Sequence, residues 1–132
     1  MTKLPHDHGE HPEDIIPLFE NGEHFLMLSE LFRQFSDGNR IRLFWILCHC
    51  QECVINLSAM MNMSSPAISH HLKQLKSAGL ITGRRNGKEV YYRAADTPVV
   101  KALHDAIREL SELSCPGGCL IPEEKKYKQT TL

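Results

Sequence analysis

The fold of this chain is decided by one stretch, residues 56–93, which reads NLSAMMNMSSPAISHHLKQLKSAGLITGRRNGKEVYYR. Its apolar residues recur first at helical spacing and then in two runs with the pattern of strands. Gly79 closes the helical part, since glycine readily adopts the left-handed conformation that ends a helix. The predicted elements are a helix at 56–62, a tight turn at 63–65, a second helix at 66–77, and strands at 80–85 and 88–93.

Local chemistry supports each of these elements. Ser65 is expected to cap the second helix through its hydroxyl, with Pro66 at the first helical position, where its missing N–H does no harm. Asn86 and Gly87 are expected to join the strands, because both residues tolerate positive φ. The second helix has one apolar face, formed by Ile68, Leu72 and Leu75. Two helices followed by a hairpin predict a mainly α fold with a β-hairpin wing, the winged helix-turn-helix, which reads DNA.

The opposite face of the second helix is polar, and the hairpin beside it is basic. Residues 64–93 hold six Lys and Arg against Glu89 alone, although the formal net charge of the whole chain is −1. A basic block on such a motif indicates double-stranded DNA as the partner. The residues expected to face bases are Ser64, Ser65, Ala67, Ser69 and His70, and those expected to hold phosphate are Lys73, Gln74, Arg84, Arg85 and Lys88.

Length and composition exclude several classes of protein. The 132 residues suffice for one core with terminal extensions, and no apolar run approaches the ~20 residues of a membrane span. The amino terminus lacks the apolar stretch of a secretion signal, so we expect a cytoplasmic protein without a membrane partner. No glycine-rich phosphate loop and no paired acid and base are evident, so we do not expect an enzyme.

Three regions are expected along the chain. The first is a flexible, histidine-rich arm at 1–13, the second a DNA-binding and dimerisation domain at 14–114, and the third a cysteine-containing tail at 115–132. The last helix of the domain carries a wide apolar stripe, which needs a partner surface. We therefore expect a homodimer formed through the first and last helices.

Apolar periodicity predicts the remaining helices of the domain. One helix is expected over 14–35, either continuous or broken near Asn21-Gly22, followed by a turn at 36–39. Thr97 and Pro98 start the last helix by the same capping chemistry as above. The other expected elements are a helix at 40–50, an extended connector at 51–55, and the last helix at 98–114.

Four segments together resemble the ArsR/SmtB family of bacterial metal-responsive repressors. These segments are FSDGNRIRL at 35–43, ECVINL at 52–57, SPAISHHL at 65–72 and GKEVYYR at 87–93. The resemblance spans about residues 31–114. It implies a homodimer that binds a palindromic DNA operator and leaves it when an effector binds.

The resemblance also implies a metal effector, whose ligands lie at alternative places in different family members. At the thiolate location, Cys53 matches the first cysteine, but Ile55 stands where the second would be. Cys48 and Cys50 lie just upstream, and the arm could supply imidazoles. The candidate ligands of this location are therefore Cys53, Cys48, Cys50, His6, His8 and His11.

A second family location lies on the last helix and is matched less well. Asp96 fits its first position, but Pro98 replaces a histidine, and the later positions hold Glu109 and Glu112. Carboxylates alone would bind zinc weakly, because zinc prefers nitrogen and sulfur donors.

A further possibility comes from the cysteines themselves. Cys115 and Cys119, four residues apart at a helix end, could chelate a soft ion together with Cys48, Cys50 or Cys53. Such thiolates suit zinc or cadmium, and three of them suit an arsenite-like species. Two alternatives stay open: the same repressor switched by oxidation or persulfidation of Cys48 and Cys115, and a metal-sequestering thiol protein without an operator.

Overall fold

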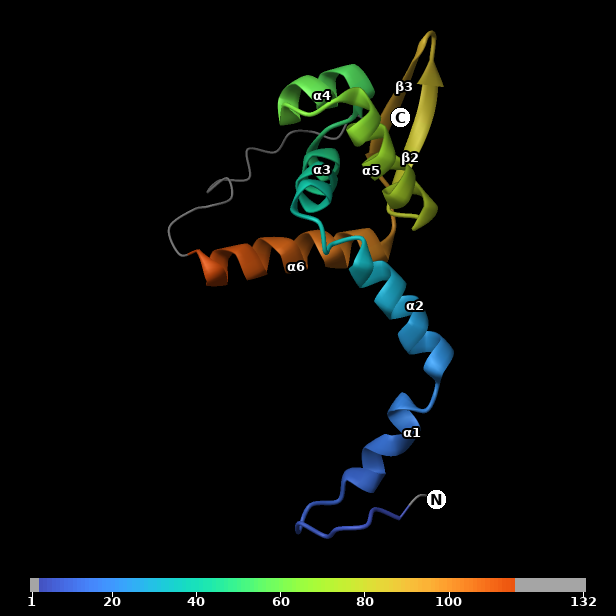
Figure 1. Ribbon diagram of the computed structural model, residues 1–132, viewed down its shortest axis with the longest axis vertical. Helices are drawn as coiled ribbons and strands as arrows, with labels where there is room; N and C mark the ends of the chain where they lie inside the picture. The colour runs from blue at the N-terminus through green and yellow to red at the C-terminus, as the bar shows by residue number, and fades with distance from the viewer. Residues whose placement is uncertain (1–2, 116–132) are drawn as a thin grey trace. The chain divides into compact units, whose positions relative to one another are not determined.

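The chain divides into two compact units, one ending at Arg33 and the other beginning at Gln34. The structure is a computed structural model and describes residues 3–115 (Figure 1). The positions of the units relative to one another are not determined, so each is described by itself. Among residues 3–115, no helix has both the length and the apolar character needed to cross a bilayer.

The first unit consists of short helical pieces. A 3-10 turn, η1 (Pro12–Ile15), leads into α1 (Ile16–Phe19), and α2 (Gly22–Arg33) follows after a break. The break falls at Asn21, whose side-chain oxygen accepts a hydrogen bond from the amide of His24 at 3.3 Å. The broken form of the helix expected over 14–35 is therefore the one observed. No residue of α2 is buried, and its exposed large apolar side chains are Phe25, Leu26, Met27 and Phe32.

The second unit contains the helix-turn-helix and its wing. It runs through α3 (Gly38–His49), β1 (Glu52–Cys53), α4 (Val54–Met61), α5 (Ser65–Ser77), β2 (Ile81–Asn86), β3 (Glu89–Ala94) and α6 (Pro98–Ser114). The sheet is antiparallel with strand order β1-β3-β2. In Figure 1, β2 and β3 form a hairpin that extends beside α5. The largest fully buried side chains are Phe44, Leu43, Leu47, Leu57, Ile68, Leu72, Leu75 and Leu80.

The winged helix-turn-helix predicted from the sequence is confirmed. The residue predicted to cap α5 is wrong by one position. Ser64, not Ser65, is the N-cap, and its hydroxyl accepts a hydrogen bond from the Ala67 amide at 3.3 Å. Ser65 and Pro66 therefore occupy the first two helical positions. Both serines carry the same capping group, so local chemistry alone could not choose between them.

The predicted turn of the hairpin is also wrong by one residue. Asn86 is paired with Glu89 across the strands, which leaves Gly87 and Lys88 as the two-residue turn. Gly87 has φ +66°, the left-handed conformation at the first turn position that glycine allows. The expected extended connector at 51–55 is shorter as well, since only Glu52 and Cys53 pair with β3 and Val54 already begins α4.

Candidate nucleic-acid interface

The two faces of α5 differ as the sequence predicted. Its inward face buries Ile68, Leu72 and Leu75, and α5 lies against α3, α4 and β2. The chain enters α5 through Asn62, which adopts the left-handed conformation at φ 51° and ends α4. The outward face exposes Ser65, Ser69, His70 and Lys73, with Ala67 and Gln74 half-buried at its borders. A polar face of this shape is free to enter a major groove.

The wing beside α5 exposes its cations. Arg84 and Arg85 on β2 and Lys88 in the turn are all exposed. Within residues 3–115, no ion pair engages these three cations or Lys73 on α5. Their charges are therefore available to phosphate.

Two contacts hold the wing in its shape. Gly83 pairs with Tyr92, and a Cβ at Gly83 would lie 3.1 Å from Cε1 of that ring, so the ring lies across the glycine. The Tyr91 hydroxyl donates to the Glu89 carboxylate at 3.2 Å, and this hydrogen bond raises the pKa of Tyr91. The only acid of the wing is thus engaged within the wing.

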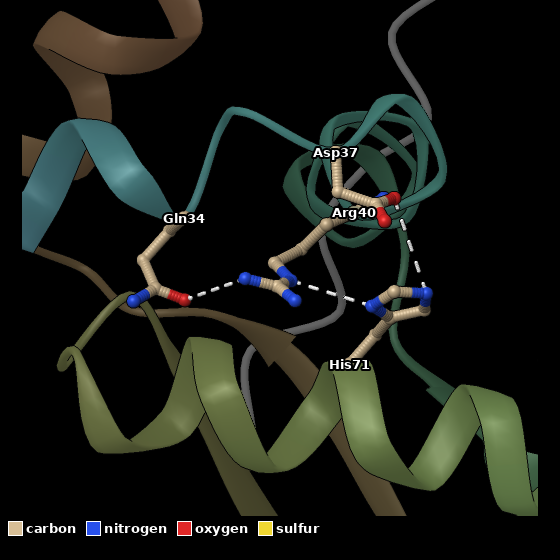
Figure 2. Close-up of polar contacts among 4 residues, drawn as sticks. All are labelled: Gln34, Asp37, Arg40 and His71. Atoms are coloured by element: carbon tan, nitrogen blue, oxygen red, sulfur yellow. Dashed lines mark hydrogen bonds and ion pairs between the residues drawn. The ribbon is translucent and has the colours of Figure 1, made fainter.

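Figure 2 shows a polar network between the start of α3 and the inward face of α5. Arg40 Nε donates to His71 Nδ1 at 3.3 Å, and Arg40 Nη1 donates to Gln34 Oε1 at 3.1 Å. On the other side of the ring, His71 Nε2 lies 4.0 Å from Asp37 Oδ1. Because the buried His71 directly follows the exposed His70, this network fixes the helix at the residue where it turns from core to solvent.

The protonation states of this network follow from its surroundings. Burial lowers the pKa of His71, the Asp37 carboxylate opposes that effect, and the charges of Arg40 and His70 add to it. A neutral imidazole is what the Arg40 hydrogen bond requires, since Nδ1 must accept. The hydrogen bond from the Arg40 amide, at 3.0 Å, lowers the pKa of Asp37 and makes this residue the N-cap of α3.

Sequence reasoning missed this network, although part of it was visible. Asp37 precedes Gly38-Asn39-Arg40 at the start of an apolar period, which is a recognisable N-cap. The contact between Arg40 and His71 joins residues 31 positions apart. No local pattern predicts such a pair.

Three of the candidate metal ligands lie close together in sequence but in different environments. Cys48 lies on α3 and Cys50 ends it, and both are half-buried, while Cys53 on β1 is buried. Burial raises the pKa of the Cys48 thiol to about 12, and burial together with Glu52 raises that of Cys50. The Cys50 thiol donates to the Ile46 carbonyl at 3.4 Å. Both thiols are therefore protonated at neutral pH until a metal or a base removes the proton.

The described residues do not assemble a complete site from these candidates. Among residues 3–115, no group of three or more His, Cys, Asp or Glu side chains is placed to hold a metal ion. Cys50 and Cys53 stand at Cys-x-x-Cys spacing. Both are free thiols in this structure.

The remaining candidates lie in the first unit or near the end of the chain. His6 and His8 stack with ring centroids 5.9 Å apart, and His11 precedes η1. Cys115 is the C-cap of α6 and is disulfide-bonded, so it offers no thiolate unless it is reduced. α6 ends at Ser114, so Cys115 stands just past the helix, and Cys119 of the predicted pair lies outside the described residues.

The last helix carries the apolar stripe expected of a contact surface. Thr97 Oγ1 accepts a hydrogen bond from the Val100 amide at 3.2 Å, which confirms the predicted cap, and Pro98 begins the helix. Of the 17 residues of α6, only Val100 is buried. Leu110 and Leu113 are 65% and 72% exposed, which is unusual for large apolar side chains on one face.

Comparisons with known proteins agree with this geometry. A family model described as bacterial regulatory protein, arsR family, matches residues 37–82, from the cap of α3 to the start of β2. A protein of Synechocystis sp. described as a transcriptional repressor SmtB homolog is 32% identical over 112 residues, which cover 85% of each chain. A cadmium resistance transcriptional regulatory protein CadC homolog of Staphylococcus aureus is 30% identical, over 68% of this chain and 75% of that protein.

A solved structure has the same fold. It is the homodimeric winged helix-turn-helix DNA-binding domain Mb0332 of Mycobacterium bovis, described as a possible ArsR-family transcriptional regulator. It aligns with a TM-score of 0.62 at 23% identity, over 70% of this chain and 86% of that one.

Proposed function

This chain belongs to the ArsR/SmtB family of bacterial metal-responsive transcriptional regulators, and on that premise we propose how it works. It is a repressor that binds a palindromic DNA operator as a homodimer. It releases the operator when a thiophilic metal ion, zinc or cadmium, binds.

One observation carries the DNA-binding part of the proposal. The outward face of α5 and the adjoining wing expose polar and cationic side chains that no ion pair within residues 3–115 engages. Serine and histidine on α5 suit base edges, and the cations of the wing suit phosphates. A metal-sequestering protein without an operator would have no use for this surface, so that alternative is disfavoured.

The homodimer is proposed from the apolar stripes of α2 and α6. Each of these helices exposes large apolar side chains, among them Phe32 on α2 and Leu113 on α6. A second copy of the chain would cover such surfaces and place two α5 helices one turn of DNA apart, about 34–36 Å. The two reading helices then match the two halves of a palindromic site.

For the effector we propose Cys53 as a ligand. It is a buried thiol at the start of α4, the first helix of the helix-turn-helix, so a metal bound there acts on the reading unit directly. Additional ligands are proposed among Cys48, Cys50, His6, His8 and His11, and among Cys115 and Cys119 in the reduced chain. Metal binding must displace the thiol protons, so it should weaken as the pH falls.

Fluorescence anisotropy tests the DNA-binding part. The full chain is titrated onto a labelled duplex from the region upstream of its own coding sequence, and onto a scrambled duplex of equal length. We expect tighter binding to the first duplex and two chains per duplex at saturation. Equal affinity for both duplexes would contradict operator recognition.

The effector is tested in the same assay with reduced protein. Zinc or cadmium should weaken operator binding by about 5- to 150-fold, the usual range of allosteric coupling. Cys53→Ser should bind the operator as the unmodified chain does and lose the metal response. Release by oxidant or polysulfide in place of metal, with mass spectrometry locating the modification on Cys48 or Cys115, would favour the redox alternative.

A further inference from the structure

Two imidazole rings meet where the end of α3 approaches α6, outside the interface described above. His49 is the last residue of α3, and its Nε2 lies 3.1 Å from Nε2 of His104 on α6. The rings are inclined at 58° with centroids 5.0 Å apart, and both are half-buried. The residues are 55 positions apart in sequence, so only the fold brings them together.

A carboxylate holds the other nitrogen of His104. Nδ1 lies 3.2 Å from Asp105 Oδ1, and the same oxygen lies 3.5 Å from Nη2 of Arg108. This acceptor keeps the proton of the neutral ring on Nδ1 and leaves the Nε2 lone pair directed at His49. The same arrangement, a carboxylate behind an imidazole, orients histidine ligands in metal sites.

Trp45 fixes the orientation of the pair. It lies one turn before His49 on α3, and its ring stacks on His104 with centroids 4.6 Å apart and planes at 7°. Its centroid is also 4.8 Å from that of His49. The stacked ring restricts rotation of His104, so the two Nε2 atoms face one another before any ligand arrives.

We propose that His49 and His104 bind a divalent late first-row cation, such as Zn²⁺ or Ni²⁺, through their Nε2 atoms. Two nitrogens bound to one tetrahedral zinc ion at about 2.0–2.1 Å lie about 3.3 Å apart, close to the 3.1 Å separation of the free pair. Imidazole suits zinc and nickel, whereas thiolates select softer ions. This nitrogen site therefore differs in its chemistry from the cysteine candidates, and it does not depend on the proposed operator release.

The surroundings of the pair define what kind of site it is. With the proton of His104 on Nδ1, His49 donates its Nε2 proton to His104, and this proton moves to Nδ1 of His49 when the cation takes its place. Within the part of the chain that the structure describes, no third His, Cys, Asp or Glu is placed to bind the same ion as the two Nε2 atoms. Water completes the coordination, so we expect the cation to exchange readily. When bound, it links α3 to α6.

The chain carries its own reporter for this site, because Trp45 is its only tryptophan. The reduced full chain, with the arm changed to H6Q, H8Q and H11Q to remove competing imidazoles, is titrated with NiCl₂ while Trp45 emission is recorded. We expect saturable quenching at one Ni²⁺ per chain, and recovery of emission when excess Zn²⁺ displaces the quencher. A chain without saturable quenching would overturn the proposal.

Matched variants assign the effect to the two rings. His49→Gln and His104→Gln should each abolish the saturable quenching, while His24→Gln, on α2, should leave it unchanged. Asp105→Asn keeps both rings and should weaken Ni²⁺ binding about tenfold. Quenching that survives either ring substitution, or that disappears when Cys48, Cys50 and Cys53 are replaced by Ser, would overturn the proposal.

A measurement on the unmodified chain guards against substitutions that disturb folding. With ¹⁵N-labelled histidine, Zn²⁺ should shift the Nε2 resonances of His49 and His104 and leave their Nδ1 nitrogens uncoordinated. Zinc that shifts only the histidines of the arm would refute the site.

Discussion

The surface that we propose faces DNA and the thiol segment at 48–53 lie in the same unit, but only the proposed DNA surface is complete within one chain. Every residue predicted to contact DNA is exposed or half-buried on α5 or the wing. The thiols at 48–53 are half-buried or buried, and no three metal-binding side chains gather among residues 3–115. Binding DNA requires one rigid element with a suitable polar face. Binding a metal effector requires ligand atoms that are brought together from distant parts of the sequence. Single substitutions should therefore have clear and separable effects on the first.

The largest effect is expected from the wing. The triple variant Arg84→Ala/Arg85→Ala/Lys88→Ala removes three phosphate contacts per protomer, which is six per dimer. The slope of log K against log salt should become less steep by about 5, with operator affinity reduced roughly 100-fold or more. Anisotropy over a series of salt concentrations measures both. Lys101→Ala, which removes an exposed cation from α6, is the control, and an unchanged slope in the triple variant would show that the wing does not touch DNA.

Breaking the polar network between α3 and α5 should have a smaller effect, and this effect should be a loss of folding stability. Arg40→Gln takes away the donors to His71 Nδ1 and Gln34 Oε1. Removing one partner of a partly buried hydrogen bond costs about 1–3 kcal/mol, measurable by urea denaturation. Arg42→Gln, at an exposed position on the same helix, should leave the free energy of unfolding nearly unchanged. Equal losses in both variants would refute a specific role for Arg40.

Removing the N-cap of α5 should have a smaller effect, and the neighbouring serine provides a matched control. Ser64→Ala should lower the free energy of unfolding by about 1 kcal/mol, because the Ala67 amide loses its acceptor. Ser65→Ala should be close to neutral, since Ser65 is already inside the helix. Thermal or urea unfolding distinguishes the two variants. A larger loss of stability in Ser65→Ala than in Ser64→Ala would show that Ser65 is the cap.

The smallest effect concerns pH. Because the pKa of His71 is lowered from 6.5 in the folded chain, the unfolded chain takes up the proton first as the pH falls. Stability contributed by the neutral ring is therefore complete above pH 6.5 and is lost below it, towards the lowered folded pKa. The free energy of unfolding should decline over that range, less steeply in His71→Gln and with the original slope in His24→Gln. A His71→Gln chain that declines as steeply as the unmodified one would contradict this assignment.

Features that depend on neighbouring residues were predicted from the sequence, whereas features that depend on contacts between distant residues were not. Thr97-Pro98 and the apolar face of α5 were predicted because capping and helical periodicity depend only on neighbouring residues. The turn at Gly87-Lys88 was misplaced because strand register decides between two adjacent glycine-containing turns, and that register is set across the hairpin. β1 was missed because two residues become a strand only through pairing with β3.

The candidate site follows the same rule. The residues proposed to contact DNA were predicted from the order of residues in one helix and one hairpin, and the structure places them exposed or half-buried on or beside those elements. The contacts of Arg40 with His71 and of His49 with His104 could not be predicted, because 31 and 55 residues separate the partners. The accessibility of the Cys48, Cys50 and Cys53 thiols depends on their burial, which sequence spacing does not reveal.

Dimethyl sulfate protection of guanine N7 on the operator duplex tests most directly whether two α5 helices read one site. The account predicts two protected major-groove segments about one helical turn apart, both lost when Ser69 and His70 are replaced by Ala. A single protected segment, protection spread evenly along the duplex, or protection that persists in the Ser69/His70 variant would contradict it.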